Sequence, residues 1–333
     1  MHFRSNAHDI LERWGRAWHH QSNRGTLVAQ NGRDIWTLQA RLPDNVDFDK
    51  IDPAELIEAF VGQPFPYEIL LANSWWPHLV VADSYRSGRV FLAGDAAHQY
   101  IPTGGYGMNT GIGDAFDLGW KLATVLHGYG GPQLLDSYDA ERRPIGQRNC
   151  RAAEKHNGVR VEISKVYGPQ LFEDGESGRQ AREVARARIM ELGDAENCSE
   201  GIEYGYIYDQ SPVILYESDA EYVSDPVTYV PSTLPGARLP SIFLEDGSAV
   251  FDLFRPYLTL IVLEDSPTEI MIDAASRLGV PLKVFPLNED LALRVYQHPA
   301  LLARPDHHIA WRGRLPQDDE DALRILSTVY GLR

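Results

Sequence analysis

The segment from residue 89 to residue 123 constrains the fold most, because it joins a strand pattern, a glycine-rich loop and a long helix without a break. It reads RVFLAGDAAHQYIPTGGYGMNTGIGDAFDLGWKLA. The continuous apolar run at residues 89–93 is typical of a strand buried on both faces. Polar and apolar residues then recur at helical spacing, which predicts a helix that begins near Gly107 and ends before the cluster at residues 128–132.

This arrangement predicts a ligand site at the start of the helix. The first N–H groups of a helix have no partner inside it and carry partial positive charge, which favours an anion or an electron-rich carbonyl edge. Glycines would let a flat ring approach the backbone closely. A phosphate or the pyrimidine edge of a flavin would both fit, and Asp95 could accept a hydrogen bond from a sugar or ribityl hydroxyl. Taken singly, these glycines are explained better by turns than by a ligand, and neither G-x-G-x-x-G nor G-x-x-x-x-G-K-[ST] occurs.

Composition narrows the class of protein. A formal charge of −16 over 333 residues argues against nucleic-acid and membrane partners, since both need clustered Lys and Arg. Two cysteines, Cys150 and Cys198, cannot build a disulfide framework or a four-cysteine zinc site, and no metal site is expected. With no signal-peptide pattern and no long apolar run, a cytoplasmic location is expected.

The remaining segments predict a mixed α/β chain. Residues 20–85 form a sheet-rich unit, with a hairpin around Asn31 and Gly32 and a short helix capped by Asp52. A long helix that tolerates Pro144 follows the helix of the opening segment, and a charged helix spans residues 175–192. Beyond an extended linker, the pattern from about Pro235 onward predicts a compact α/β module.

The run from residue 89 to residue 123 resembles the second flavin-binding motif of group A FAD-dependent aromatic hydroxylases, which include phenol and para-hydroxybenzoate hydroxylases. The resemblance implies a partial para-hydroxybenzoate-hydroxylase-like FAD and substrate domain followed by a thioredoxin-like domain. It also implies FAD as cofactor, NAD(P)H as co-substrate, a small aromatic, phenol-like substrate hydroxylated with O2, and a possible homodimer. The implied domains are residues 1–88, 89–165, 166–235 and 236–333.

The resemblance also implies the site residues. The aspartate of the Gly-Asp pair would contact the ribityl chain, and the Gly-Met-Asn backbone would meet the flavin ring. Trp75 and Trp76 would line the substrate cavity on strands, although as bare residues they are more often core. No catalytic residue is assigned. The implied cofactor-binding residues are Gly94, Asp95, Pro102, Gly105, Gly107, Met108 and Asn109.

The chain departs from the family pattern in three places. Family members begin with a strand, G-x-G-x-x-G and helix, whereas this sequence resembles roughly their C-terminal two-thirds, so a truncated reading frame or a second chain is expected to account for the rest. No C-x-x-C occurs in the thioredoxin-like part, which is therefore not expected to be a redox unit. Asp117 stands where the family usually has Asn, and because it can form an i, i+4 pair with Lys121 on a polar stripe, little effect on flavin binding is expected.

Two alternatives stay open. The chain could be a non-catalytic remnant or interaction subunit that binds no flavin. It could also keep the flavin and carry out a different reaction, such as epoxidation or oxidation without hydroxylation.

Overall fold

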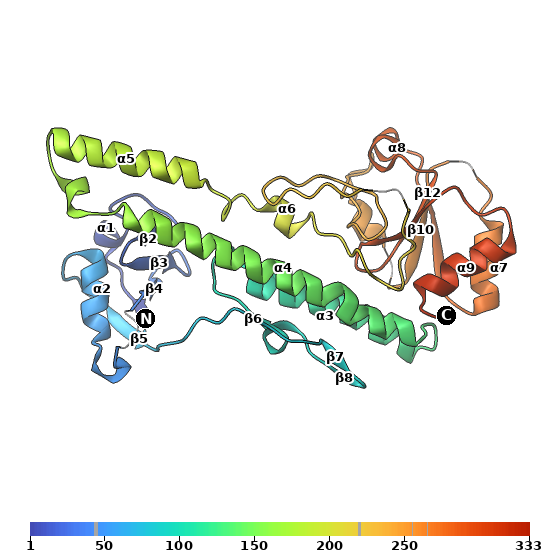
Figure 1. Ribbon diagram of the computed structural model, residues 1–333, viewed down its shortest axis with the longest axis horizontal. Coiled ribbons are helices and arrows are strands. Elements are labelled where there is room, and N and C mark those ends of the chain that lie inside the picture. Colours follow the sequence, from blue (N-terminus) through green and yellow to red (C-terminus); the bar gives the residue numbers. More distant parts are fainter. Residues whose placement is uncertain (43–45, 219–220, 255, 265) are drawn as a thin grey trace. The chain divides into compact units, whose positions relative to one another are not determined.

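The computed structural model describes residues 1–42, 46–218, 221–254, 256–264 and 266–333 (Figure 1). The chain divides into two compact units. The first comprises Met1–Pro77 and Glu162–Arg188, and the second comprises His78–Val161 and Ile189–Arg333. Of the helices in the described part of the chain, none combines the length and apolar character that a bilayer crossing needs.

The first unit is built on an antiparallel five-stranded sheet in the order β2-β3-β4-β1-β5. The hairpin predicted around Asn31 and Gly32 is confirmed, since β3 and β4 pair with Ala29 opposite Trp36. The Asp52 cap is confirmed as well, because its carboxylate accepts a hydrogen bond from the Ala54 N–H at 2.8 Å. The elements of this unit are β1 (His2–Arg4), α1 (His8–Leu11), β2 (His19–Ser22), β3 (Gly25–Ala29), β4 (Ile35–Gln39), η1 (Phe48–Lys50), α2 (Pro53–Val61), β5 (Glu68–Leu71) and η3 (Pro169–Phe172).

The second unit begins with short strands and two long helices. Its first elements are β6 (Val80–Val81), β7 (Arg86–Ser87), β8 (Val90–Phe91), η2 (Gly94–Ala96), β9 (His98–Gln99), α3 (Tyr106–Leu126) and α4 (Pro132–Lys165). The predicted helices are confirmed, including the tolerance of Pro144 inside α4. Helices α3 and α4 lie side by side (Figure 1), and the Asn149 side chain of α4 donates a hydrogen bond to Thr110 of α3 at 2.8 Å. The division between the units falls within two helices, since α4 belongs to the second unit only up to Val161 and α5 (Glu176–Leu192) belongs to the first unit up to Arg188.

The strand predicted at residues 89–93 differs from expectation. Only Val90 and Phe91 are in a strand, which pairs with β7, and the Val90 side chain is 64% exposed. Burial on both faces needs neighbouring strands on both sides. Within the described residues β8 has one neighbour, two residues long, so its apolar side chains stay partly exposed.

The C-terminal part of the second unit holds a four-stranded sheet in the order β11-β10-β12-β13. Strands β10 and β11 are parallel and the other pairs are antiparallel. All residues of β10 are buried, because apolar clusters cover both of its faces. The elements are α6 (Glu200–Glu203), η4 (Val250–Leu253), β10 (Leu258–Val262), α7 (Glu269–Leu278), β11 (Leu282–Pro286), α8 (Asp290–Tyr296), β12 (Ala300–Ala303), β13 (Ile309–Gly313) and α9 (Asp319–Val329).

The segment predicted to be an extended linker is irregular but partly buried. It holds the short helix α6, and Tyr208, Val213 and Ile214 are buried within the second unit. Helix α8 was not predicted, because its seven residues are too few to show a helical period.

Candidate functional site

The glycine-rich loop ends in an open helix N-terminus. Gly104 and Gly105 have φ values of +84° and +68°, which L side chains rarely adopt, and Gly105 is the N-cap of α3. No side chain caps this end. Within the described part of the chain, the backbone N–H groups of Tyr106, Gly107 and Met108 have no hydrogen-bond acceptor. The start of α3 therefore presents donors to whatever approaches it.

The space in front of these donors is open. A methyl group placed on Gly105 or Gly107 would meet no heavy atom within 4 Å. Met108 is 75% exposed and Asn109 is exposed as well. The Asn109 amide donates a hydrogen bond to the Gly105 carbonyl at 2.9 Å, and the Gly105 N–H bonds the carbonyl of the exposed Pro102 at 3.1 Å. These contacts stabilise the loop without filling the space in front of the first N–H groups of α3.

Asp95 lies on η2, which packs against α3. A Cβ on Gly111 would stand 3.2 Å from the Cα of Gly94, so the two backbones approach closely there. The Asp95 side chain is exposed, and its carboxylate has no hydrogen-bond donor among the described residues. It is therefore available to a ligand hydroxyl.

Asp114 joins this loop to both helices, a role that the sequence did not reveal. Its carboxylate accepts hydrogen bonds from the Gly94 N–H at 3.1 Å, from His98 Nε2 at 2.8 Å and from Arg142 Nε at 2.9 Å. Burial opposes the charge, but the His98 hydrogen bond and the Arg142 charge hold the pKa of Asp114 below its usual value. His98 is buried on β9 and forms part of this support.

The polar stripe of α3 faces inward at Asp117 and Lys121. Both side chains are buried, and Lys121 Nζ donates to Asp117 at 2.8 Å and to Glu141 at 2.6 Å. Arg304, from the loop after β12, donates to Glu141 at 2.6 Å and to Asp117 at 3.0 Å and pairs with Asp306. We refer to Asp117, Lys121, Glu141, Arg304 and Asp306 as the buried ion network.

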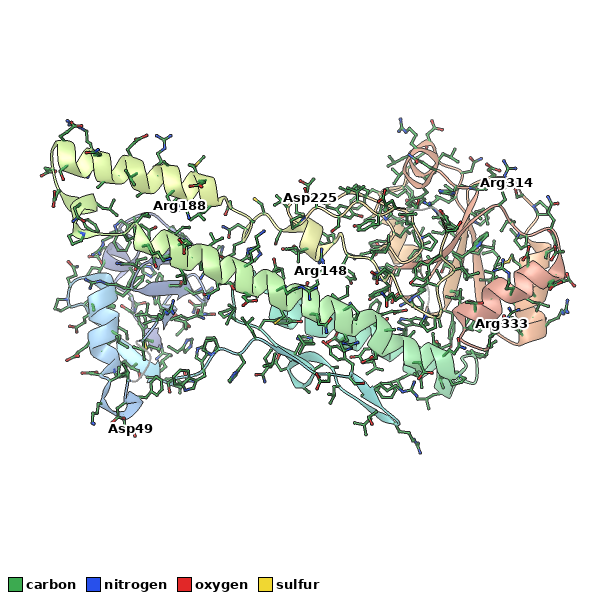
Figure 2. The ribbon with its side chains drawn as sticks, viewed as in Figure 1. Asp49, Arg148, Arg188, Asp225, Arg314 and Arg333 are labelled. Atoms are coloured by element: carbon green, nitrogen blue, oxygen red, sulfur yellow. The ribbon has the colours of Figure 1, made fainter. Side chains whose placement is uncertain are left out.

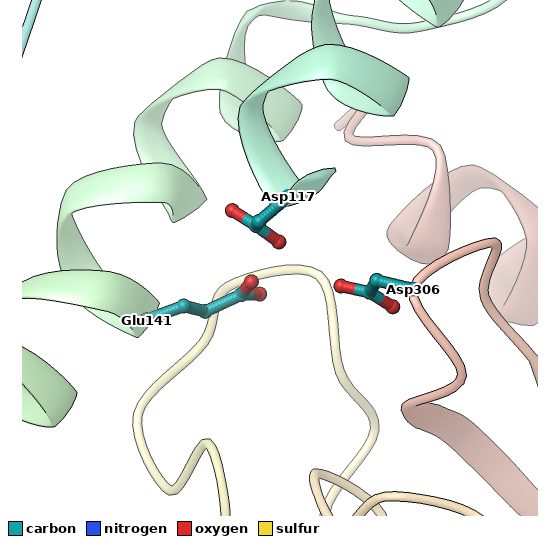
Figure 3. Close-up of side chains that lie close together, drawn as sticks. All are labelled: Asp117, Glu141 and Asp306. Carbon is teal, nitrogen blue, oxygen red and sulfur yellow. The ribbon is translucent and has the colours of Figure 1, made fainter. Parts of the chain in front are cut away.

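The three carboxylates of the buried ion network point toward one another (Figure 3). Such a group could hold a cation, and Lys121 and Arg304 supply two cationic groups there already. Burial and the Glu141 charge raise the pKa of Asp117, whereas Arg304 and Lys121 hold the pKa of Glu141 at about 2 in spite of its burial. One shared proton on Asp117 would balance the charges, so we assign the network no metal ion.

Trp75 and Trp76 do not lie on a strand. Both follow β5 in an irregular segment of the first unit and are 54% and 61% exposed, so the core interpretation is wrong too. The ring of Trp76 meets only Phe48 among the described aromatic rings, edge to face at 5.7 Å. Strand β5 ends at Leu71, and the proline at position 77 disfavours a continuation of the strand.

Two family models match the chain. An FAD binding domain matches residues 9–153, and the C-terminal region of aromatic-ring hydroxylases matches residues 232–331. The C-terminal module is therefore described as a ring-hydroxylase C-terminal domain in place of the thioredoxin-like domain expected from the sequence.

Curated proteins similar over nearly the whole chain include two fungal enzymes. An FAD-dependent monooxygenase of Emericella nidulans is 34% identical over 99% of this chain and 58% of its own length. One of Penicillium oxalicum is 35% identical over 99% of this chain and 68% of its own length. The chain thus spans about three-fifths to two-thirds of the length of these relatives.

Solved structures of flavin-dependent enzymes are similar to this chain in fold. The rebeccamycin biosynthetic enzyme RebC with reduced flavin is 32% identical, with a TM-score of 0.86 over 100% of this chain and 62% of its own. The flavin-dependent monooxygenase PieE, in complex with FAD and substrate, is 26% identical, with a TM-score of 0.86 over 100% of this chain and 65% of its own.

Proposed function

We propose that this chain, which belongs to the family of FAD-dependent aromatic-ring hydroxylases, holds the isoalloxazine ring of FAD at the start of α3 and serves the hydroxylation of a phenol-like substrate with NAD(P)H and O2. The observation that carries the proposal is the uncapped N-terminus of α3, with its open space at Gly105 and Gly107. Family membership rests on the two matching family models and on the relative that the chain covers to 68%.

The residues of the site fit a flavin. The N–H groups at Gly107 and Met108 would donate to the carbonyl edge of the ring, and the positive end of α3 would stabilise negative charge there. The Asp95 carboxylate would accept a hydrogen bond from the ribityl chain. Flavin supplies the redox chemistry when bound, and the chain binds and orients it. Gly94, Pro102, Gly105 and Asn109 would shape the loop around the ring.

The substrate class is also part of this proposal. Relatives include a phenol 2-monooxygenase of Pseudomonas and a 4-methyl-5-nitrocatechol 5-monooxygenase of Burkholderia, both named for aromatic substrates. Trp75 and Trp76 are exposed aromatic side chains that could contact such a ring. The proposal also includes the division of the chain into domains after residues 88, 165 and 235. It includes a homodimer as well.

Flavin titration tests the proposed site. The fluorescence of riboflavin should be quenched on binding. Because this chain would contact the ring and the ribityl group, its affinity for riboflavin should be close to its affinity for FAD. Asp95→Ala should lower both affinities about tenfold, which is the cost of one good hydrogen bond. The control is Asp83→Ala, which deletes a carboxylate that lies in an irregular segment outside the site. Absence of flavin binding at millimolar concentration, or equal binding by Asp95→Ala, would contradict the proposal.

A second candidate is an interaction subunit without flavin. It is favoured by an apolar stripe on the outer face of α3, where Met108, Ile112 and Phe116 are 75%, 60% and 50% exposed. Large exposed apolar patches mark surfaces that meet another molecule. Product analysis with labelled O2 separates the candidates, because a hydroxylase places the label in the product and a subunit without flavin yields none.

A further inference from the structure

A pocket of about 600 Å³ lies in the second unit, between α4 and the irregular chain that follows α6. Its volume falls within the range of small-molecule sites. Pro144, Arg148 and Arg151, which are spaced for one face of α4, supply one wall. Described residues between positions 205 and 235 supply the other, with Tyr206, Tyr216 and Tyr222 among them. None of these residues belongs to the proposed flavin site.

The two arginines give the pocket a positive wall. Arg148 is half-buried, and its guanidinium donates to the carbonyls of Ile202 at 2.7 Å and Gly201 at 2.8 Å. Figure 2 shows it on the side of α4 that faces this segment. Within the described residues, Arg148 pairs with no carboxylate, and Arg151 has neither an ion pair nor a hydrogen bond.

The charge of this wall is unbalanced. Burial lowers the pKa of Arg148, Tyr222 acts in the opposite direction, and the neighbouring Arg151 charge adds a smaller lowering effect. Two guanidinium groups that form no ion pair with a described residue favour an anion, to which arginine binds with planar, charge-assisted hydrogen bonds.

The remaining walls favour a flat, apolar ring. The Tyr222 hydroxyl donates to the Gly205 carbonyl, and the Tyr216 hydroxyl donates to the Tyr208 carbonyl at 2.7 Å. These hydroxyls are used within the protein, so the tyrosines offer mainly their rings to a ligand. Glu217 also lines the pocket, but its charge is compensated by a bidentate ion pair with Arg312. Asp209 keeps a carboxylate that could accept a hydroxyl of the ligand.

We propose that this pocket binds a hydroxylated planar aromatic acid, with its anionic group at Arg148 and Arg151 and its ring against the tyrosines. The site is separate from the flavin site, and the proposal does not depend on flavin binding. A chain that serves aromatic hydroxylation would then carry a second position for an aromatic acid.

Calorimetric titration with 6-hydroxy-2-naphthoate tests the proposal on the chain without added flavin. We expect one saturable site, with the uncharged 2-naphthol binding at least tenfold more weakly. Arg151→Gln should lower the affinity for the naphthoate about tenfold, which corresponds to loss of one charge-assisted contact. Arg314→Gln, an exposed arginine of the same unit outside the pocket, should leave the affinity unchanged.

Arg151 is chosen because it is exposed and its loss should not unfold the chain, whereas Arg148→Gln would also remove two contacts to carbonyls. The proposal would be overturned if Arg151→Gln bound the naphthoate as tightly as the unchanged chain. It would also be overturned if 2-naphthol bound equally well, or if inorganic phosphate alone matched the affinity of the naphthoate. Because flavin takes no part in this titration, its outcome is independent of the flavin experiment above.

Discussion

At the scale of single residues, Asp114 supports the flavin-site loop without facing the ligand. Asp114→Asn keeps the shape but removes the charge that faces Arg142 and His98. A buried arginine left without its partner costs about 3–5 kcal/mol, so we expect a loss of that order in the free energy of unfolding. Asp136→Asn, which removes one side of an exposed pair with Arg86, should cost less than about 1 kcal/mol. Urea unfolding measures the free energy of unfolding of both variants. Equal losses would show that Asp114 contributes no more to stability than an exposed ion pair does.

Arg304 has a comparable role in the buried ion network. Arg304→Met preserves much of the side-chain volume but leaves Glu141 and Asp306 without their main cation. We expect the free energy of unfolding to fall by about 3–5 kcal/mol. The matched change Arg324→Met breaks an exposed pair with Asp321 and should cost at most about 1 kcal/mol. A stability for Arg304→Met at or above that of the unchanged chain would mean that the network contributes no net stability.

At the scale of elements, α3 shows how far the sequence reaches. Its limits and the glycine loop before it are predicted from the helical period and the turn residues. The sequence does not predict which stripe of α3 is buried, because a prediction from the helical period takes the apolar face to be the one that meets the core. In α3 the polar stripe is buried instead, since Arg142 and Glu141 come from α4 and Arg304 from a loop nearly two hundred positions along the chain. Only the local pair Asp117–Lys121 was visible in the sequence.

This inversion yields a prediction for α3. Ile112→Gln changes an exposed position and should alter the free energy of unfolding by less than about 0.5 kcal/mol. Asp117→Leu adds apolar volume but leaves buried N–H donors of Lys121 and Arg304 without an acceptor, so it should cost about 3 kcal/mol or more. Thermal unfolding of the two variants compares them directly. If Ile112→Gln were the more destabilising change, the burial of α3 described above would be wrong.

At the scale of the whole molecule, the buried ion network ties together regions that match two different family models. Asp117 and Glu141 lie in the region matched by the FAD binding domain, whereas Arg304 and Asp306 lie in the ring-hydroxylase C-terminal region. These four residues all belong to the second unit, and the described residues of the first unit have no buried carboxylate. The two units should therefore respond differently to acid.

Hydrogen exchange followed from pH 6 to pH 3 tests this difference. The pKa of Glu141 falls from 4.5 to about 2 on folding, because Arg304 and Lys121 outweigh its burial. Its contribution to stability is complete above about pH 4.5 and is lost as the pH falls toward 2. The raised pKa of Asp117 acts in the opposite direction, whereas the lowered pKa of Asp306 acts with Glu141, so two of the three carboxylates favour loss of stability in acid. After correction for intrinsic exchange, protection should fall together in α3, α4 and β12, while β3 and β4 serve as the internal reference. Loss of protection in β12 alone would show that the network does not couple the two regions, because a shared set of charges must release both sides at once.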